Sequence, residues 1–359
     1  MYVTAENNRE YSLRFVQGKP SERLLWAFML PGIVELAKNL GYGEYWELGH
    51  ERLGCLNFCC PISPFKVLND NLKITDSPDG GFVRREYQSS HGVLHELRMN
   101  NEIVEHRIRT EADLDILINT LRDTRIEAES ERYSFHKRRH EPFMAIAAQT
   151  DTASACQQFL QYEFGVMNFY YLLNDYPDKM EECMSIYQGL MAQKYKFMQN
   201  AECDFFYQGE NTSTSLISPE YYAKYGIRQV RDFVDAAHAV NKRAIVHMCG
   251  LLHELLPLIR STGMDGIHAL TPPETGNVSF SEIYKAMPGD CSVLGRFGSL
   301  EWVGKPKGKV KDNLRKLLPH EIYQKHPFVL LVSSDGAPYT LDDLYNVRDA
   351  VAEYEQEGN

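Results

Sequence analysis

Short apolar runs alternate with longer amphipathic stretches from about residue 143 to the end of the chain. The apolar runs predict buried strands at 143–148, 203–207, 243–248, 265–270, 292–295 and 328–332. Helical spacing predicts helices from about Thr152, over 178–200, from Ser218 to about Val240, and over 253–261, 279–286 and 341–354. Strand, loop and helix repeated with short turns indicate parallel strands joined by right-handed crossovers. We therefore expect an α/β protein with a closed (β/α)8 TIM-like barrel rather than an open sheet.

The first part of the chain, residues 1 to about 140, has a less regular pattern. Residues 26–40 predict a helix, and 76–81 predict a turn between extended segments, with 82–87 as the returning strand of a hairpin. We expect this part to supply early barrel elements and an inserted sheet that caps the barrel mouth. Residues 1–359 then form one domain, irregular over 1–140 and built of regular βα units over 141–359.

Composition narrows the class of protein. Hydrophobic residues make up 43% of the chain and charged residues 24%, and the formal net charge is −11, with no long basic block. This charge disfavours nucleic acid as a partner. No apolar run is long enough to span a bilayer, and the first residues lack the basic and apolar regions of a secretory signal. We expect a cytoplasmic protein without a membrane partner, and a homodimer is the commonest assembly of such proteins.

The eight cysteines form no CxxC pair and no regular framework. Reduced thiols are therefore expected. Cys59 and Cys60 are adjacent, and because neighbouring side chains of an extended segment diverge, we interpret both as structural.

The segment Ile245-Val246-His247-Met248-Cys249-Gly250 carries the strongest chemical signal. His247 and Cys249 lie two positions apart on a strand, so both side chains point the same way at its carboxyl end, where barrel enzymes place their active sites. Imidazole and thiolate together suit a borderline-soft cation such as Zn²⁺. The alternative is a hydrogen-bonded histidine beside a small core cysteine.

Other candidates follow the ends of neighbouring strands. Glu210 follows the strand before His247 and is a candidate metal ligand or catalytic base, or else a loop carboxylate. The candidates for substrate binding are Gln149, Asp151, Tyr207, His268 and Glu274, each with an ordinary core or loop role as its alternative. Aromatic side chains that can line an apolar pocket, or simply pack in the core, are Tyr162, Tyr170, Tyr171 and Tyr207.

Several of these segments together resemble a known family. His-x-Cys-Gly at 247–250 is similar to the uroporphyrinogen decarboxylase superfamily, and within it to the zinc-dependent, corrinoid-linked methyltransferases. Further similarity covers an acidic residue followed by Leu-x-Ser-Pro (209–220), a helix, glycine and Asp-Gly connection (261–267), and the last strand, turn and helix (332–344). The resemblance is good from about residue 143 and vague before it.

The resemblance implies a zinc-dependent methyltransferase that exchanges a methyl group between a small substrate and a corrinoid. Zinc would be held by His247, Cys249 and an acidic residue. The family has a further cysteine ligand after the last strand, where this chain has Ser333, Ser334 and Asp335. Asp335 is thus a candidate ligand or catalytic group, or an ordinary turn residue, and Glu210 is the other candidate for the third ligand. No Asp-x-His-x-x-Gly motif is present, so the corrinoid would arrive on a partner protein.

Two other functions stay open at this point. The arginine-rich motif with which the family's haem-pathway enzyme binds porphyrin carboxylates has no counterpart at 26–32. No aspartate occurs near 58–61, where that enzyme's catalytic aspartate is expected, and both differences disfavour the porphyrin reaction. One alternative is a metal-free decarboxylase of a smaller acid. The other is a non-catalytic binding protein, for which the missing third cysteine is the best support.

Overall fold

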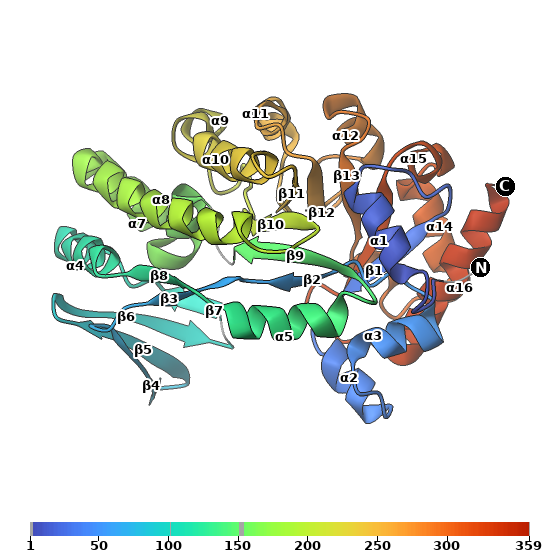
Figure 1. Cartoon of the computed structure of the whole chain (residues 1–359), viewed down its shortest axis with the longest axis horizontal. Coiled ribbons are helices and arrows are strands. Elements are labelled where there is room, and N and C mark those ends of the chain that lie inside the picture. Colours follow the sequence, from blue (N-terminus) through green and yellow to red (C-terminus); the bar gives the residue numbers. More distant parts are fainter. Residues whose placement is uncertain (1–2, 101, 151–153, 359) are drawn as a thin grey trace.

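A parallel eight-stranded sheet organises the chain, in the order β1-β14-β13-β12-β11-β10-β9-β2 (Figure 1). The computed structural model describes residues 3–100, 102–150 and 154–358. The strands of this sheet are β1 (Leu25–Met29), β2 (Cys59–Ile62), β9 (Ala145–Thr150), β10 (Phe205–Gly209), β11 (Arg243–His247), β12 (Gly266–Leu270), β13 (Ser292–Phe297) and β14 (Phe328–Ser333). The α/β fold class and the parallel pairing expected from the sequence are confirmed.

Helices connect and cover these strands (Figure 1). They are α1 (Asn8–Val16), α2 (Ile33–Asn39), α3 (Tyr45–Leu48), α4 (Glu111–Arg122), α5 (Ser130–His140), α6 (Ala155–Gln158), α7 (Gly165–Asp175), α8 (Pro177–Gln199), α9 (Pro219–Tyr221), α10 (Ile227–His238), α11 (Leu256–Ser261), α12 (Phe280–Ala286), α13 (Ser299–Trp302), α14 (Lys307–Leu317), α15 (His320–Lys325) and α16 (Leu341–Glu357). Short π or 3-10 turns precede or follow some of them, at Gly49–Leu53, Phe159–Glu163, Tyr222–Gly226 and His253–Leu255. The expected N-cap at Ser218 is present, because its side chain accepts a hydrogen bond from the Tyr221 amide.

The sheet curls so that its outer strands, β1 and β2, approach each other. The amide of Leu56, just ahead of β2, donates to the carbonyl of Trp26 in β1 over 2.7 Å. Among the described residues no strand ladder joins β1 to β2. In the described part of the chain the barrel is therefore closed here by this backbone hydrogen bond rather than by a strand ladder.

Side chains of each strand alternate between the barrel interior and the surrounding helices. On β10, Phe205 and Tyr207 belong to the interior cluster, whereas Phe206 packs with the helices and Gln208 accepts from Tyr195 of α8. The interior cluster contains residues from α1 and from most strands of the sheet, so apolar side chains form the core inside the barrel.

Residues 26–40 are not one helix, contrary to the expectation from the sequence. They form β1 and then α2, separated by Gly32 with φ of 77°. The first residues of β1 are buried on both faces of the strand. All residues of β1 are apolar, so the sequence shows no alternation of apolar and polar positions that would distinguish a strand from a helix. The segment forms a strand because it pairs in parallel with β14.

The expected hairpin is confirmed within an antiparallel sheet of β4 (Lys73–Asp79), β5 (Phe82–Ser89), β6 (Gly92–Met99) and β7 (Glu102–Glu105). The insertion also contains the pair β3 (Phe65–Leu68) and β8 (Arg125–Ala128). In Figure 1 the four-stranded sheet lies at the lower left, on the side toward which β2 and β9 run. It therefore lies on the mouth side of the barrel.

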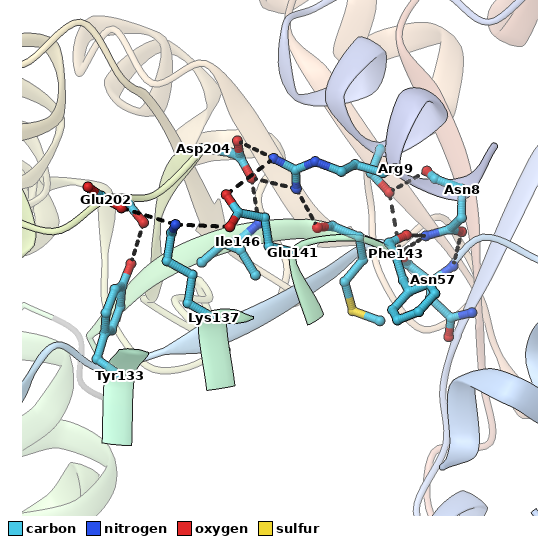
Figure 2. A network of polar contacts seen from close by, with 12 residues as sticks. Asn8, Arg9, Asn57, Tyr133, Lys137, Glu141, Phe143, Ile146, Glu202 and Asp204 are labelled. Atoms are coloured by element: carbon cyan, nitrogen blue, oxygen red, sulfur yellow. Dashed lines mark hydrogen bonds and ion pairs between the residues drawn. The ribbon is translucent and has the colours of Figure 1, made fainter. Parts of the chain in front are cut away.

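Helix α1 closes the opposite end of the barrel, where its Phe15 and Val16 join the interior cluster. Asn8 of this helix is fully buried, and its side chain donates to the carbonyls of Asn57 (2.8 Å) and Phe143 (2.7 Å). Arg9 binds Asp204 through both carboxylate oxygens, each over 3.2 Å (Figure 2). The amino ends of β2, β9 and β10 are thus tied to the first helix.

The structure also bears on membrane-spanning helices and on the state of the cysteines. Among the described residues no helix combines the length and apolar character needed to cross a membrane. All eight cysteines lie within the described residues, and each is a free thiol.

Candidate functional site

Two imidazoles meet at the carboxyl ends of neighbouring strands. His247 ends β11 and His268 lies in β12, and their Nδ1 atoms are 2.7 Å apart. Burial, and then the positive charge of Arg296, lower the pKa of His247 to about 4. Burial, and then His247, hold the pKa of His268 well below its ordinary value. Both rings are therefore neutral at pH 7, with one Nδ1 donating a proton to the other.

Aromatic side chains surround this pair. The Tyr207 hydroxyl lies 3.1 Å from the same His268 Nδ1, and the Phe58 ring stacks on His268 with the ring centres 6.4 Å apart. Tyr207 and His268 line a cavity of about 240 Å³. Its other walls are mainly apolar, from Ala27, Phe28, Met29, Tyr45, Leu56, Asn57, Phe58, Cys59, Pro61, Leu294 and Leu331. The cavity thus lies between the edge strands β1 and β2 and reaches into the barrel interior.

Cys249 follows β11 and is half-buried, two positions after His247 as the sequence predicts. Its thiol donates to the side-chain oxygen of Asn211 over 2.7 Å. Burial raises the pKa of Cys249, while the nearby Arg296 opposes the shift. The thiol is therefore protonated and hydrogen-bonded in this arrangement.

An ion pair at the same end of the barrel was not foreseen from the sequence. Arg296 of β13 is bound to Asp335, which also accepts from the Ser299 amide (2.9 Å) and the Ser333 hydroxyl (2.7 Å). Burial alone would raise the pKa of Asp335, but these donors together hold it below its ordinary value. Asp335 is thus ionised and fully engaged with its neighbours.

The inward direction of Arg296 could have been predicted from the alternation of side chains along its strand. The strand at 292–295 continues to Phe297 in the structure, and Arg296 lies two positions after the inward-facing Leu294. Alternation along β13 therefore directs Arg296 to the interior side at the mouth. Asn211 offers no comparable signal, because its contact with Cys249 depends on a loop conformation with φ of 54°.

Glu210 does not face the mouth as expected. It continues the alternation of β10, in which Tyr207 points inward and Gln208 outward, so its carboxylate lies on the helix side. The Ser154 amide and hydroxyl each donate to it over 2.8 Å. Burial raises the pKa of Glu210 to about 7, and the hydrogen bonds from Ser154 oppose the shift.

The remaining candidates lie apart from the imidazole pair. Gln149 lines a different cavity, and Glu274 is exposed on the loop after β12. Tyr170 donates to the Leu216 carbonyl over 2.9 Å and so has a packing role. Asp151 lies outside the described residues.

Tyr162 and Tyr171 are exposed, at 46% and 61%. Burial of the hydroxyl, then Cys249 and Glu102, raise the pKa of Tyr162.

The predicted zinc ligands do not converge as the side chains stand. Asp335 is bound to Arg296, Glu210 faces the helices, and the Cys249 thiol is directed to Asn211. Within residues 3–100, 102–150 and 154–358, no three His, Cys, Asp or Glu side chains lie close enough to share a metal ion. Neutral imidazoles and a thiol are suitable zinc donors in kind, but this arrangement does not fit the ion.

A sequence model described as "Uroporphyrinogen decarboxylase (URO-D)" matches residues 160–353, more than half of the chain. The chain belongs to the uroporphyrinogen decarboxylase family. The match includes the strands that carry Tyr207, His247, His268 and Arg296, so the whole polar group at the mouth lies on family structure. No curated protein matches the sequence of this URO-D family member.

Solved structures agree with this fold. A methyltransferase from Methanosarcina mazei has a TM-score of 0.61 and 14% sequence identity, over 98% of this chain and 99% of that chain. A B12-independent methionine synthase from Shewanella sp. W3-18-1 has a TM-score of 0.42 and 12% identity, over 82% of this chain and 76% of that chain. The first likeness shows that the two proteins share a fold over nearly the whole of this chain. The second is too weak to bear on the comparison.

Proposed function

We propose that this URO-D family member is a methyltransferase that exchanges a methyl group between a small uncharged substrate and a corrinoid carried by a partner protein. The observation that carries the proposal is the neutral His247–His268 pair at the end of an apolar cavity. The likeness to the M. mazei methyltransferase is consistent with it.

The walls of the cavity favour a methylated molecule over an acid. The residues that line it include no lysine or arginine within the described part of the chain, and Arg296 nearby is already paired with Asp335. A buried carboxylate needs a cationic partner, whereas a methyl carbon gains about 0.8 kcal/mol by burial against apolar walls. At about 240 Å³ the cavity suits a small substrate.

The imidazole pair supplies acid–base chemistry for this exchange. When the small substrate is methylated, its heteroatom bonds to the methyl carbon, and the bond to the carrier breaks with its electron pair left on the carrier. The proton of the heteroatom passes to His268, which shares it with His247 across 2.7 Å. In the reverse direction the same pair returns the proton. Tyr207 positions the ring of His268 through its hydroxyl.

Zinc is a separate prediction, drawn from the family resemblance, because the candidate ligands among the described residues do not converge as they stand. His247 and Cys249 would hold the ion only if the thiol turned away from Asn211, and zinc would then lower the pKa of a thiol or polarise a heteroatom as a Lewis acid. The metal is measured by elemental analysis of chelator-washed protein, with the His247→Ala, Cys249→Ala double variant as the comparison. About one equivalent in the wild type and none in the variant supports zinc. No metal in either protein, even after reconstitution with Zn²⁺, contradicts it and leaves the imidazole pair as the reacting groups.

Methyl exchange itself is tested anaerobically with methylcobalamin and a panel of small thiols, amines and phenols, by following the absorbance of the corrinoid. We expect the wild type to accelerate demethylation and His268→Asn to be slower by about 10²- to 10⁴-fold. His238→Gln is the matched control, because His238 pairs with Asp265 far from the mouth. Equal rates with and without the wild-type protein contradict the proposal.

Decarboxylation of a small acid is a second candidate, favoured by Arg296. The Nε of this guanidinium is buried and lacks a hydrogen-bond partner among the described residues. A substrate carboxylate that displaced Asp335 would satisfy it. Release of CO₂ from small acids, enhanced in Asp335→Asn, would favour this reaction over methyl exchange.

A further inference from the structure

A second cavity, of about 430 Å³, lies on the other side of β2 from the mouth cavity. Cys59 lines the mouth cavity and Cys60 lines the second one, because neighbouring strand side chains diverge. Its other walls come from β3, from α5 and from Gln149 near the end of β9. The two cavities are therefore separate spaces divided by one edge strand.

Basic side chains gather in the second cavity. Arg132 and His136 lie four residues apart on α5 and so share one face of the helix. Lys66 reaches the cavity from β3. In the described part of the chain Arg132 makes no ion pair, although the protein as a whole has a net charge of −11.

The acidic groups nearby are committed to other cations. Glu127 lies 3.7 Å from the Lys66 ammonium but 2.9 Å from Arg125. Glu44, whose charge also acts on His136, forms an ion pair with Arg139 on the same face of α5 as Arg132 and His136. Lys66 thus has one carboxylate at the edge of ion-pair distance, and among the described residues Arg132 has none.

The basic side chains of the second cavity lie close together, and their mutual repulsion destabilises the charged forms. Burial, followed by His140 and Arg132, lowers the pKa of His136. Guanidinium and ammonium groups within one concave surface repel each other, and a bound anion removes that repulsion while it accepts their hydrogen bonds.

We propose that this cavity binds an oxyanion group, a phosphate or a carboxylate, of a small ligand. Arg132 presents a planar fork that suits two oxygens, Lys66 adds a positive charge from β3, and the His136 ring can donate a hydrogen bond. The Gln149 amide provides a neutral donor on the side of the barrel. The site does not depend on the reaction at the mouth.

The test is a titration of the full chain with inorganic phosphate and, separately, with succinate, followed by calorimetry and by the ring signals of His136 in NMR spectra. We expect saturable binding of at least one anion and a shift of the His136 signals. Arg132→Ala should weaken the binding by about tenfold or more, since it removes the unpaired guanidinium. Whichever anion binds more tightly identifies the oxyanion as phosphate or carboxylate.

Arg138→Ala is the matched control, because Arg138 is an exposed arginine of the same helix that does not line the cavity. It should bind the anions like the wild type. Absence of saturable binding to the wild type overturns the proposal. An equal loss in Arg132→Ala and Arg138→Ala also overturns it, because it shows general attraction to a basic helix.

Discussion

The two ends of the barrel use polar side chains in different ways. At the amino ends of the strands, Asn8 and Arg9 of α1 satisfy backbone carbonyls and Asp204 in a closed network (Figure 2). At the carboxyl ends, His247 and His268 are neutral and adjacent, and His268 lines a cavity. The first arrangement leaves nothing for a ligand, whereas the second keeps nitrogen atoms available to one.

The amino ends of the strands therefore contribute to stability, and the carboxyl ends of the same strands carry the groups proposed for the reaction. Side chains only a few positions apart on β10 serve both purposes, since Asp204 ties down its start and Tyr207 positions His268 near its end. Barrel enzymes generally divide their two faces in this manner. Substitutions at one end should therefore change the free energy of unfolding, and substitutions at the other should change turnover.

The largest expected effect is at the mouth. His268→Asn keeps a hydrogen-bonding group beside Tyr207 but cannot take up the proton, so turnover should fall by about 10²- to 10⁴-fold. The melting temperature should change by only a few degrees, as measured by calorimetry. If His268→Asn unfolded at a much lower temperature but kept the specific activity of the wild type, His268 would have a structural rather than a catalytic role.

The next effect is at the closed end. Asn8→Ala removes two donated bonds and the one that Asn8 Oδ1 accepts from the Asn57 amide over 2.8 Å. Buried partners left without a hydrogen bond should lower the free energy of unfolding by about 3 kcal/mol, measured in urea. Glu10→Ala, on the exposed side of α1, is the control and should change it by under about 0.5 kcal/mol. A lower turnover per folded molecule in Asn8→Ala would contradict the assignment of stability to this end of the barrel and of the reaction to the other.

A pH-dependent effect of similar size is expected from Glu210. Its pKa rises from 4.5 to about 7 on folding, so the folded chain holds a proton that the unfolded chain releases between these values. Stability is therefore full below pH 4.5 and falls as pH rises through 7, by about 3 kcal/mol at 1.4 kcal/mol per pKa unit. Urea unfolding across this range should show that loss in the wild type and not in Glu210→Gln. Parallel curves for the two proteins would contradict the burial of an ionisable carboxyl here.

The smallest effect concerns the rim of the closed end. Lys137 bridges Glu141 (2.9 Å) and Glu202 (3.1 Å), whose side chains are 40% and 86% exposed. Lys137→Ala should change the free energy of unfolding by less than about 1 kcal/mol, and less still at high salt. A loss as large as that of Asn8→Ala would show that the network is strengthened at its exposed edge as well as in its buried part.

The sequence predicted the regular part of the fold because each βα unit carries its own pattern. Parallel strands buried on both faces appear as continuous apolar runs, and amphipathic helices follow them. The same rule failed at 26–40, where β1 depends on pairing with the last strand, β14, about 300 residues later. Long-range pairing leaves no local signal.

The site was predicted in part for a related reason. His247, Cys249, Tyr207 and His268 were identified because strand position fixes direction. Glu210 and Asp335 were both expected at the mouth from their places in the chain. Asp335 lies at that end but is bound to Arg296, whereas Glu210 turns to the helix side and accepts from Ser154. Charged side chains are placed by such partners, which composition and spacing do not reveal.

The most direct measurement compares the two ends in one assay, as the initial rate of methylcobalamin demethylation per folded molecule. We predict that Asn8→Ala, although less stable, turns over at the wild-type rate below its unfolding transition, and that His268→Asn, although stable, is slower by about 10²-fold or more. Equal rates for His268→Asn and the wild type would contradict the assignment of the reacting groups to the imidazole pair.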